Sequence, residues 1–280
     1  MTEVACGLCG GVDSEPVVAS SGLRVVRCRG CGLVYVNPRP AEDALQDLYA
    51  EYHSRNGGDE DSWAALMRDV FRESAGVLEA SRNGKGPGRL LDVGCGFGDF
   101  IAAMGIRGWR AEGVDPSPKV VGAAAARGLP VRLGTLEGID PAAGPYDVVT
   151  MFYVLEHLPD PMGALRKAHD LLAPGGILLV RVPHTTPIVR MLAPFGVGES
   201  LYDVPYHLYD FSPTVLRNML GAAGFVEPRT FPGRSTRPPR FGPRVASLLF
   251  GTLARGLYSF SGGGFLLPGV SKTTVARTPG

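Results

Sequence analysis

From Arg89 onwards the sequence alternates between two hydrophobic patterns. Short apolar runs, typical of buried parallel strands, are separated by stretches whose apolar residues recur at helical spacing. The predicted strands are 89–93, 110–114, 130–133, 147–152, 177–182 and 225–231, and the predicted helices are 98–106, 118–127, 161–172 and one starting near Ser212. Regular alternation of this kind predicts an α/β fold with a doubly wound parallel sheet and helices on both faces.

Two features refine the ends of these elements. Asp160 is placed to cap the helix at 161–172, and Pro174-Gly175-Gly176 is expected to stop it. At the C-terminus, residues 272–277 predict a last strand that pairs antiparallel.

The N-terminal third has a different pattern. Residues 34–36 predict a short strand that ends in a proline-rich turn, and 41–53 has helical spacing. A second predicted helix carries Trp63, and the glycine-rich stretch 83–88 resembles a hinge. We therefore divide the chain into an N-terminal module (1–40), a helical linker or lid (41–84) and a main domain (85–280). In the lid, Tyr49, Tyr52 and His53 either cover a ligand or pack one helix on the sheet.

A basic insertion at about 232–271 separates the last two predicted strands. Its arginines at 234, 237, 240 and 244 alternate with prolines, which predicts an extended chain up to Arg244. Beyond that point an amphipathic helix is predicted, because apolar residues recur every four positions, at Val245, Leu249, Leu253 and Leu257.

Composition and charge exclude some classes of protein. The chain has 280 residues, of which 45% are hydrophobic, and this excludes a wholly disordered protein. The net charge is only +1, so the total does not suggest nucleic-acid binding. However, eight basic residues and no acidic residue follow Glu227, which leaves −7 on the preceding chain. We hypothesise that the insertion forms part of a substrate site or a membrane-surface contact and attracts an anionic or lipid-linked molecule. The alternative is a helix packed on a partner subunit, with solvated arginines.

No targeting or membrane-spanning segment is recognisable. The N-terminus lacks a basic start followed by an apolar run, and no apolar stretch reaches about 18 residues. A cytoplasmic location is therefore the default expectation.

Four of the five cysteines form a metal-binding pattern. Cys6 and Cys9 are separated by eighteen residues from Cys28 and Cys31, and each pair is a C-x2-C. This spacing predicts a zinc ribbon, in which four thiolates fill a tetrahedral shell, so the ion would be structural. A disulfide or a redox C-x-x-C is the less favoured alternative. Few basic residues lie between the pairs, so the module is expected to act as a scaffold or a docking site.

A glycine-rich loop follows the first strand of the main domain. Gly94, Gly96 and Gly98 allow the backbone to approach a ligand closely just before a helix. Asp115 ends the next strand, where a carboxylate can accept hydrogen bonds from a ribose diol. These features predict an adenosyl cofactor and leave a nicotinamide possible. The G-x-G-x-G spacing and Asp92, whose charge would repel a pyrophosphate and attract a sulfonium or ammonium group, favour a methionine-derived cofactor.

These segments resemble the class I S-adenosylmethionine (SAM)-dependent methyltransferases, which have a Rossmann-like sheet. The resemblance covers roughly 90–231 and is carried by LLDVGCGFGDF, AEGVDPS, YDVVTMFYVLEHLPDP and LLAPGGILLVRVP. It implies that Gly94, Gly96 and Gly98 lie against the methionine moiety and that Asp115 holds the ribose. It further implies that Thr135 and Leu136 flank the adenine and that Phe152 lines the pocket.

Two further segments resemble a subgroup of this family with an N-terminal zinc ribbon. They are CRGCGLVYVNPRP and PYHLYDFSPTVLRNMLGAAGF. Members of this subgroup often methylate small metabolites, sugars or natural-product intermediates, so the resemblance implies a small-molecule acceptor.

Methyl transfer to a hydroxyl needs a base, and histidine is the usual choice because its pKa lies near neutrality. His157, His184 and His207 follow predicted strands or lie in loops at the carboxyl edge of the sheet, where such folds bind ligands. Glu156 could orient a loop or act on substrate. Structural hydrogen bonding is the competing role for each histidine.

The sequence therefore predicts a SAM-dependent methyltransferase acting on oxygen or nitrogen, rather than carbon, of a small molecule in secondary-metabolite or sugar biosynthesis. The alternative is a nucleic-acid or protein methyltransferase that docks its substrate through the zinc ribbon. A third hypothesis, a binding protein that has lost the activity, is disfavoured by the intact glycine loop. The acceptor and the oligomeric state are not predicted.

Overall fold

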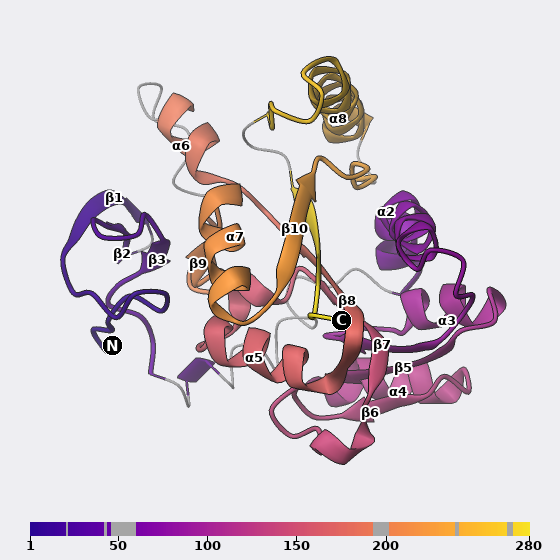
Figure 1. The fold of residues 1–280 in the computed structure, drawn as a ribbon. Helices are drawn as coiled ribbons and strands as arrows, with labels where there is room; N and C mark the ends of the chain where they lie inside the picture. Colours follow the sequence, from indigo (N-terminus) through magenta and orange to yellow (C-terminus); the bar gives the residue numbers. More distant parts are fainter. Residues whose placement is uncertain (21, 42–43, 46–59, 193–201, 239–240, 268–270) are drawn as a thin grey trace.

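The main sheet has seven strands in the order β10-β11-β8-β7-β4-β5-β6 (Figure 1). The computed structural model describes residues 1–280 except 21, 42–43, 46–59, 193–201, 239–240 and 268–270. The strands are β4 (Arg89–Val93), β5 (Arg110–Asp115), β6 (Val131–Leu133), β7 (Tyr146–Phe152), β8 (Leu172–Val182), β10 (Val226–Phe231) and β11 (Lys272–Arg277). The predicted α/β sheet is confirmed.

Strand directions create a binding edge at the carboxyl end of β4. The strands from β6 to β8 are parallel, whereas β11 pairs antiparallel with both β8 and β10, as predicted for the last strand. β5 lies on one side of β4 and β7 on the other, so the strand order reverses there. Open α/β sheets bind ligands at such a reversal.

Helices cover both faces of this sheet. Apolar side chains of α2 (Glu60–Ser81) and α3 (Asp99–Ile106) form one core cluster with the sheet, and those of α5 (Pro161–Leu171) and α7 (Pro213–Ala222) form another. The other helices with bounds among the described residues are α4 (Pro118–Ala126), α6 (Thr186–Leu192), α8 (Phe241–Phe260) and the short 3-10 turns η1 (Pro141–Ala143) and η2 (Leu155–His157). Among the helices described, none is long and apolar enough to cross a membrane.

Three predicted boundaries were wrong or fall outside the description. Pro174-Gly175-Gly176 was expected to end a helix, but α5 ends at Leu171 and these residues belong to β8. α8 begins at Phe241 rather than after Arg244, because a proline is tolerated in the first helical turn, where its missing N–H is not needed. In the predicted helix at 41–53 the described part is helical at 44–45, and Tyr49, Tyr52 and His53 lie outside the described residues.

The N-terminal module forms a second, antiparallel sheet with help from the main domain. Its strands are β1 (Ser14–Ser20), β2 (Leu23–Cys28) and β3 (Val34–Val36), and the fourth is β9 (Tyr209–Asp210). His207 was expected to lie in a loop, and no helix or strand is assigned at 207–208, but Tyr209 begins a strand that was not predicted, because two residues are too short to show a periodic signal. Pairing of β3 with β9 joins the two sheets into one body.

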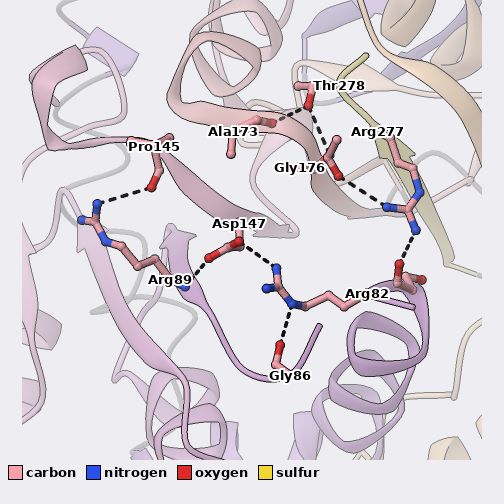
Figure 2. A network of polar contacts seen from close by, with 11 residues as sticks. Arg82, Gly86, Arg89, Pro145, Asp147, Ala173, Gly176, Arg277 and Thr278 are labelled. Carbon is pink, nitrogen blue, oxygen red and sulfur yellow. Dashed lines mark hydrogen bonds and ion pairs between the residues drawn. The ribbon is translucent and has the colours of Figure 1, made fainter. Parts of the chain in front are cut away.

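A polar network closes the amino ends of the strands (Figure 2). Arg82, which directly follows α2, forms an ion pair of 2.9 Å with Asp147, whose other oxygen accepts a hydrogen bond of 2.7 Å from the Arg89 backbone N–H. Arg277 donates to the carbonyl of Ser81. These contacts fix both ends of the glycine-rich stretch 83–88, at the edge opposite the predicted ligand site.

Candidate active site

The glycine loop connects β4 to α3 in a conformation that only glycine adopts easily. Gly94, Gly96 and Gly98 have φ values of 65°, 53° and 80°, in the left-handed region. A Cβ at Gly94 would collide with Val154, and one at Gly98 would lie 2.7 Å from Leu129. The loop is therefore fitted to its surroundings, with its backbone at the carboxyl edge of the sheet.

Asp115 lies beside this loop. Its side chain is buried, and its two oxygens accept hydrogen bonds of 2.9 Å from the backbone N–H groups of Gly96 and Ser117. Each carboxylate oxygen can accept a second hydrogen bond, so a ribose diol fits this group. Gly134 donates to the Asp115 carbonyl at 3.0 Å, which brings the following Thr135 next to the same strand end.

Of the three residues predicted to line the cofactor pocket beyond the glycine loop, Leu136 and Phe152 are buried in the core. Thr135 is exposed, whereas Leu136 is buried in the core cluster with α5 and α7. The Phe152 ring is also buried and packs against Phe71 and Phe100, with ring centroids 5.1 and 4.8 Å away. Phe152 therefore belongs to the core that packs α2 and α3 on the sheet.

A second buried carboxylate, Asp92, lies at the end of β4. It accepts a hydrogen bond of 2.6 Å from Thr150 Oγ1. Burial, and then the charge of Asp115, raise the pKa of Asp92 to about 7. A cationic ligand would relieve both effects, because an opposite charge favours the ionised carboxylate. The residues present therefore fit the sulfonium and ammonium groups of SAM.

Two of the three candidate histidines lie together beyond β7. His157 ends η2, and its ring centroid is 4.8 Å from that of His207. His157 Nδ1 lies 2.9 Å from the Tyr206 carbonyl. Since a carbonyl only accepts, Nδ1 of His157 carries a proton in this contact. Burial lowers the pKa of His207 to about 4, so that ring is neutral at neutral pH.

The Glu156 side chain lies close to these two rings. Its side chain is fully buried, and neither carboxylate oxygen has a hydrogen-bond partner among the described residues. The carboxylate and the two imidazoles bring ligand atoms within 4.8 Å of one another. Burial, and to a lesser extent the charge of Asp210, raise the pKa of Glu156 to about 8. The three side chains form a compact group, and Val154, two residues before Glu156, lies beside Gly94 of the cofactor loop.

His184 has a different environment. Its Nδ1 lies 2.8 Å from Nζ of buried Lys272, on the neighbouring strand β11. Burial, and then the lysine charge, lower the pKa of His184 to about 3. The Nδ1 lone pair is therefore occupied by the ammonium group. The sequence did not indicate Lys272 or Asp210, because strand pairing across long separations brings them here.

An arginine-lined cavity lies beside the N-terminal end of α2. Its volume is about 430 Å³, and it is lined by Asp61, Ser62, Ala65, Arg68, Arg237, Pro238 and Arg244. Arg237 also pairs with Asp69. A Cβ at Gly96 would lie 3.8 Å from Trp63 Nε1, so this end of α2 adjoins the glycine loop.

The four N-terminal cysteines form a cluster that fits a tetrahedral metal ion. Sγ of Cys6 is 3.4 Å from Sγ of Cys31, the Cys9–Cys28 distance is 3.5 Å, and all four sulfurs lie within 4.8 Å of one another. Zinc–sulfur bonds of about 2.3 Å at tetrahedral angles require sulfur separations of about 3.8 Å. Although burial opposes ionisation, hydrogen bonds from the Cys31 backbone and the Cys9 side chain lower the pKa of Cys28 to about 7, which favours a thiolate there, whereas burial raises the pKa of Cys6 and of Cys31.

Comparison with known proteins supports the assignment made from this geometry. A family model described as a methyltransferase domain matches residues 57–226. A ubiquinone biosynthesis O-methyltransferase of Marinobacter nauticus is 32% identical over 163 residues, which span 54% of this chain and 68% of that protein. The protein of the same name from Caulobacter sp. is 37% identical over 152 residues, which span 51% of this chain and 60% of that protein.

Solved structures share the fold. 1,6-Didemethyltoxoflavin-N1-methyltransferase of Burkholderia thailandensis, with bound S-adenosylhomocysteine, superposes with a TM-score of 0.54 at 20% identity, covering 95% of this chain and all of that one. The plantazolicin methyltransferase BpumL gives 0.55 at 15% identity, covering 85% and 99%. Together with the glycine loop and Asp115, these matches show that the chain belongs to the class I SAM-dependent methyltransferases.

Proposed function

We propose that this enzyme methylates a hydroxyl group, or an amine nitrogen, of a small anionic acceptor. The observation that carries the proposal is the group of Glu156, His157 and His207, because the first two of these residues closely follow Val154, which lies beside Gly94 of the cofactor loop. Relatives named as O-methyltransferases favour oxygen as the attacked atom.

In this proposal, different residues bind different parts of the cofactor. The backbone of the glycine loop holds the methionine moiety, Asp115 binds the ribose diol, and Asp92 faces the positive charge. SAM supplies an electrophilic methyl group and a neutral thioether as leaving group. The chain's task is to align the acceptor oxygen with the methyl group and to exclude water.

The histidine pair accepts the acceptor's proton. When SAM is bound it would supply the methyl group, and His157 or His207 would take the proton that the acceptor hydroxyl loses. The new imidazolium lies beside Glu156, whose ionisation is favoured by a nearby positive charge. The proton is thus held without leaving an isolated buried charge.

The acceptor's charge is inferred from the arginine-lined cavity. Arg68 and Arg244 face this space together with Arg237, which is already paired with Asp69. Guanidinium groups bind carboxylate and phosphate oxygens through paired hydrogen bonds. We extend the proposal to acceptors of sugar or secondary metabolism that carry such a group, so the test panel includes phenolic, sugar and natural-product hydroxyls.

The N-terminal module is proposed to bind structural zinc through Cys6, Cys9, Cys28 and Cys31. The competing proposal, docking of nucleic acid through this module, needs a positive face. Three of its four arginines instead face carboxylates: Arg24 lies 3.1 Å from Glu3, Arg27 3.9 Å from Glu15, and Arg29 3.5 Å from Asp13 and 3.2 Å from Glu15. This arrangement favours a scaffold.

The proposal is tested by S-adenosylhomocysteine release with a panel of anionic and uncharged acceptors. His157→Ala and His207→Ala should each lower kcat by about a hundredfold or more and leave S-adenosylhomocysteine affinity unchanged. The control is His169→Gln, which alters a ring packed on Phe225 away from this group. Arg68→Ala should raise KM for anionic acceptors alone. Wild-type kcat in both histidine variants would refute the base, and an unchanged KM would refute the anionic acceptor.

A further inference from the structure

α8 presents its apolar side chains to solvent. The face that contacts the body of the protein is made of small or polar residues: Ala254 and Gly251 are buried, Ser247 donates a hydrogen bond of 2.9 Å to the Thr236 carbonyl, and Tyr258 donates one of 3.3 Å to Thr230. A helix of a globular protein normally buries its apolar stripe instead.

The outward face is large and continuous. Leu249, Leu253 and Phe260 are 66, 52 and 95% exposed. The other exposed large apolar residues of this helix are Phe241, Val245, Leu248 and Phe250, and Phe265 continues the patch beyond its end. Figure 1 shows α8 at the top of the view, standing clear of the helices that cover the sheet. An apolar patch of this kind marks an interaction surface.

The charged residues of α8 are both arginines. Arg244 and Arg255 lie on α8 itself, and no acidic residue follows Glu227 in the sequence. A helix face with apolar side chains and arginines, and no acidic residue on the helix, complements a surface whose outer layer is anionic and whose deeper layer is apolar.

A second copy of the chain fits this face less well. If two α8 helices packed antiparallel through the middle of the patch, near Leu249 and Phe250, Arg244 of each copy would approach Arg255 of the other. A parallel pair would place identical arginines side by side. Either arrangement brings like charges together with no acidic residue of this segment to offset them.

We propose that α8 lies in the plane of an anionic membrane surface, with Leu249, Leu253 and Phe260 inserted between lipids and its arginines at the phosphates. The helix rests on the bilayer and does not cross it, in keeping with its length and composition. Arg244 also lines the arginine cavity, so the bound helix holds that cavity at headgroup level. The inference does not rest on the proposed acceptor, because it concerns binding to lipid alone.

The experiment is vesicle flotation of the full-length protein, measured without acceptor. We expect wild type to float with equimolar phosphatidylcholine–phosphatidylglycerol vesicles, to stay unbound with phosphatidylcholine alone and to be released by about 1 M salt. The double variant Leu249→Gln/Leu253→Gln should bind roughly a hundredfold more weakly. Arg255→Gln should bind about fivefold more weakly. The matched control is Ile106→Gln, which removes an apolar side chain that is 90% exposed at the end of α3.

The melting temperature of each variant tests whether the fold is intact, and we expect wild-type values because none of the substituted positions is buried. Failure of wild type to bind the anionic vesicles would overturn the proposal. So would an equal loss of binding in Ile106→Gln. A wild-type dimer that dissociates in the Leu249→Gln/Leu253→Gln variant, without any vesicle binding, would assign the face to a second copy and refute the membrane contact.

Discussion

Glu156→Gln should remove a pH-dependent loss of stability that the buried carboxyl group imposes on the fold. Both Glu156 oxygens lack a hydrogen-bond partner among the described residues, and the side chain has no exposed surface. Glutamine has nearly the same shape and cannot ionise. The substitution therefore changes the titration of the site with little change in packing.

The magnitude follows from the pKa of Glu156 in the two states. Burial, followed by the charge of Asp210, raises that pKa from 4.5 to about 8 on folding. The folded state therefore binds more protons than the unfolded state between these values, and the free energy of unfolding falls as pH rises through this window. A difference of this size corresponds to about 5 kcal/mol, all of which is lost above about pH 8.

Urea unfolding at pH 5, 7 and 9 measures this effect. Wild type and Glu156→Gln should be similarly stable at pH 5, and the variant should be more stable at pH 9 by several kcal/mol, with about 5 kcal/mol as the upper bound. Asp92, whose pKa is also raised, is present in both proteins and cancels in the difference. Glu137→Gln, at an exposed position, serves as the control and should follow wild type. A stability difference between wild type and Glu156→Gln that is the same at all three pH values would refute the reasoning.

Three further predictions concern the cofactor and metal sites. Cys28→Ser should abolish stoichiometric zinc in elemental analysis and lower the melting temperature, since three thiolates leave the shell incomplete. Gly94→Ala should weaken S-adenosylhomocysteine binding at least about tenfold by calorimetry, because its Cβ would collide with Val154; Gly122→Ala, which meets nothing within 4 Å, should bind normally. Asp115→Asn should weaken the same binding about tenfold without unfolding the protein, and an unchanged affinity would contradict its ribose role.

Features encoded by local pattern were predictable from the sequence. Both ends of the strand at 89–93 were predicted correctly. This five-residue segment is rich in apolar residues and lies between a glycine-rich linker and the Gly94 turn. The cysteine spacing likewise predicted a cluster that the structure brings together. In both cases the signal lies within a short stretch of chain.

Features that depend on distant pairing were not predictable. β9 is only two residues long and exists because Tyr35 and Tyr209 pair across most of the chain. Lys272 reaches His184 because β11 lies beside β8. For α8, periodicity predicted a helix with an apolar stripe, but no local pattern specifies whether that stripe faces the core or solvent.

The shared sheet also determines the order in which the chain can fold. The cysteine cluster involves residues close in sequence, so it can assemble soon after Cys31 has left the ribosome. One edge of the neighbouring strand β3 can pair only after β9 has been synthesised. The hydrogen bond from Arg39 to the Tyr209 hydroxyl likewise links residues 170 positions apart. Contacts of such separation form late and leave an unpaired strand edge until then. Metal binding would hold that edge in register throughout synthesis, so zinc supply should govern the yield of folded enzyme more than its rate of catalysis.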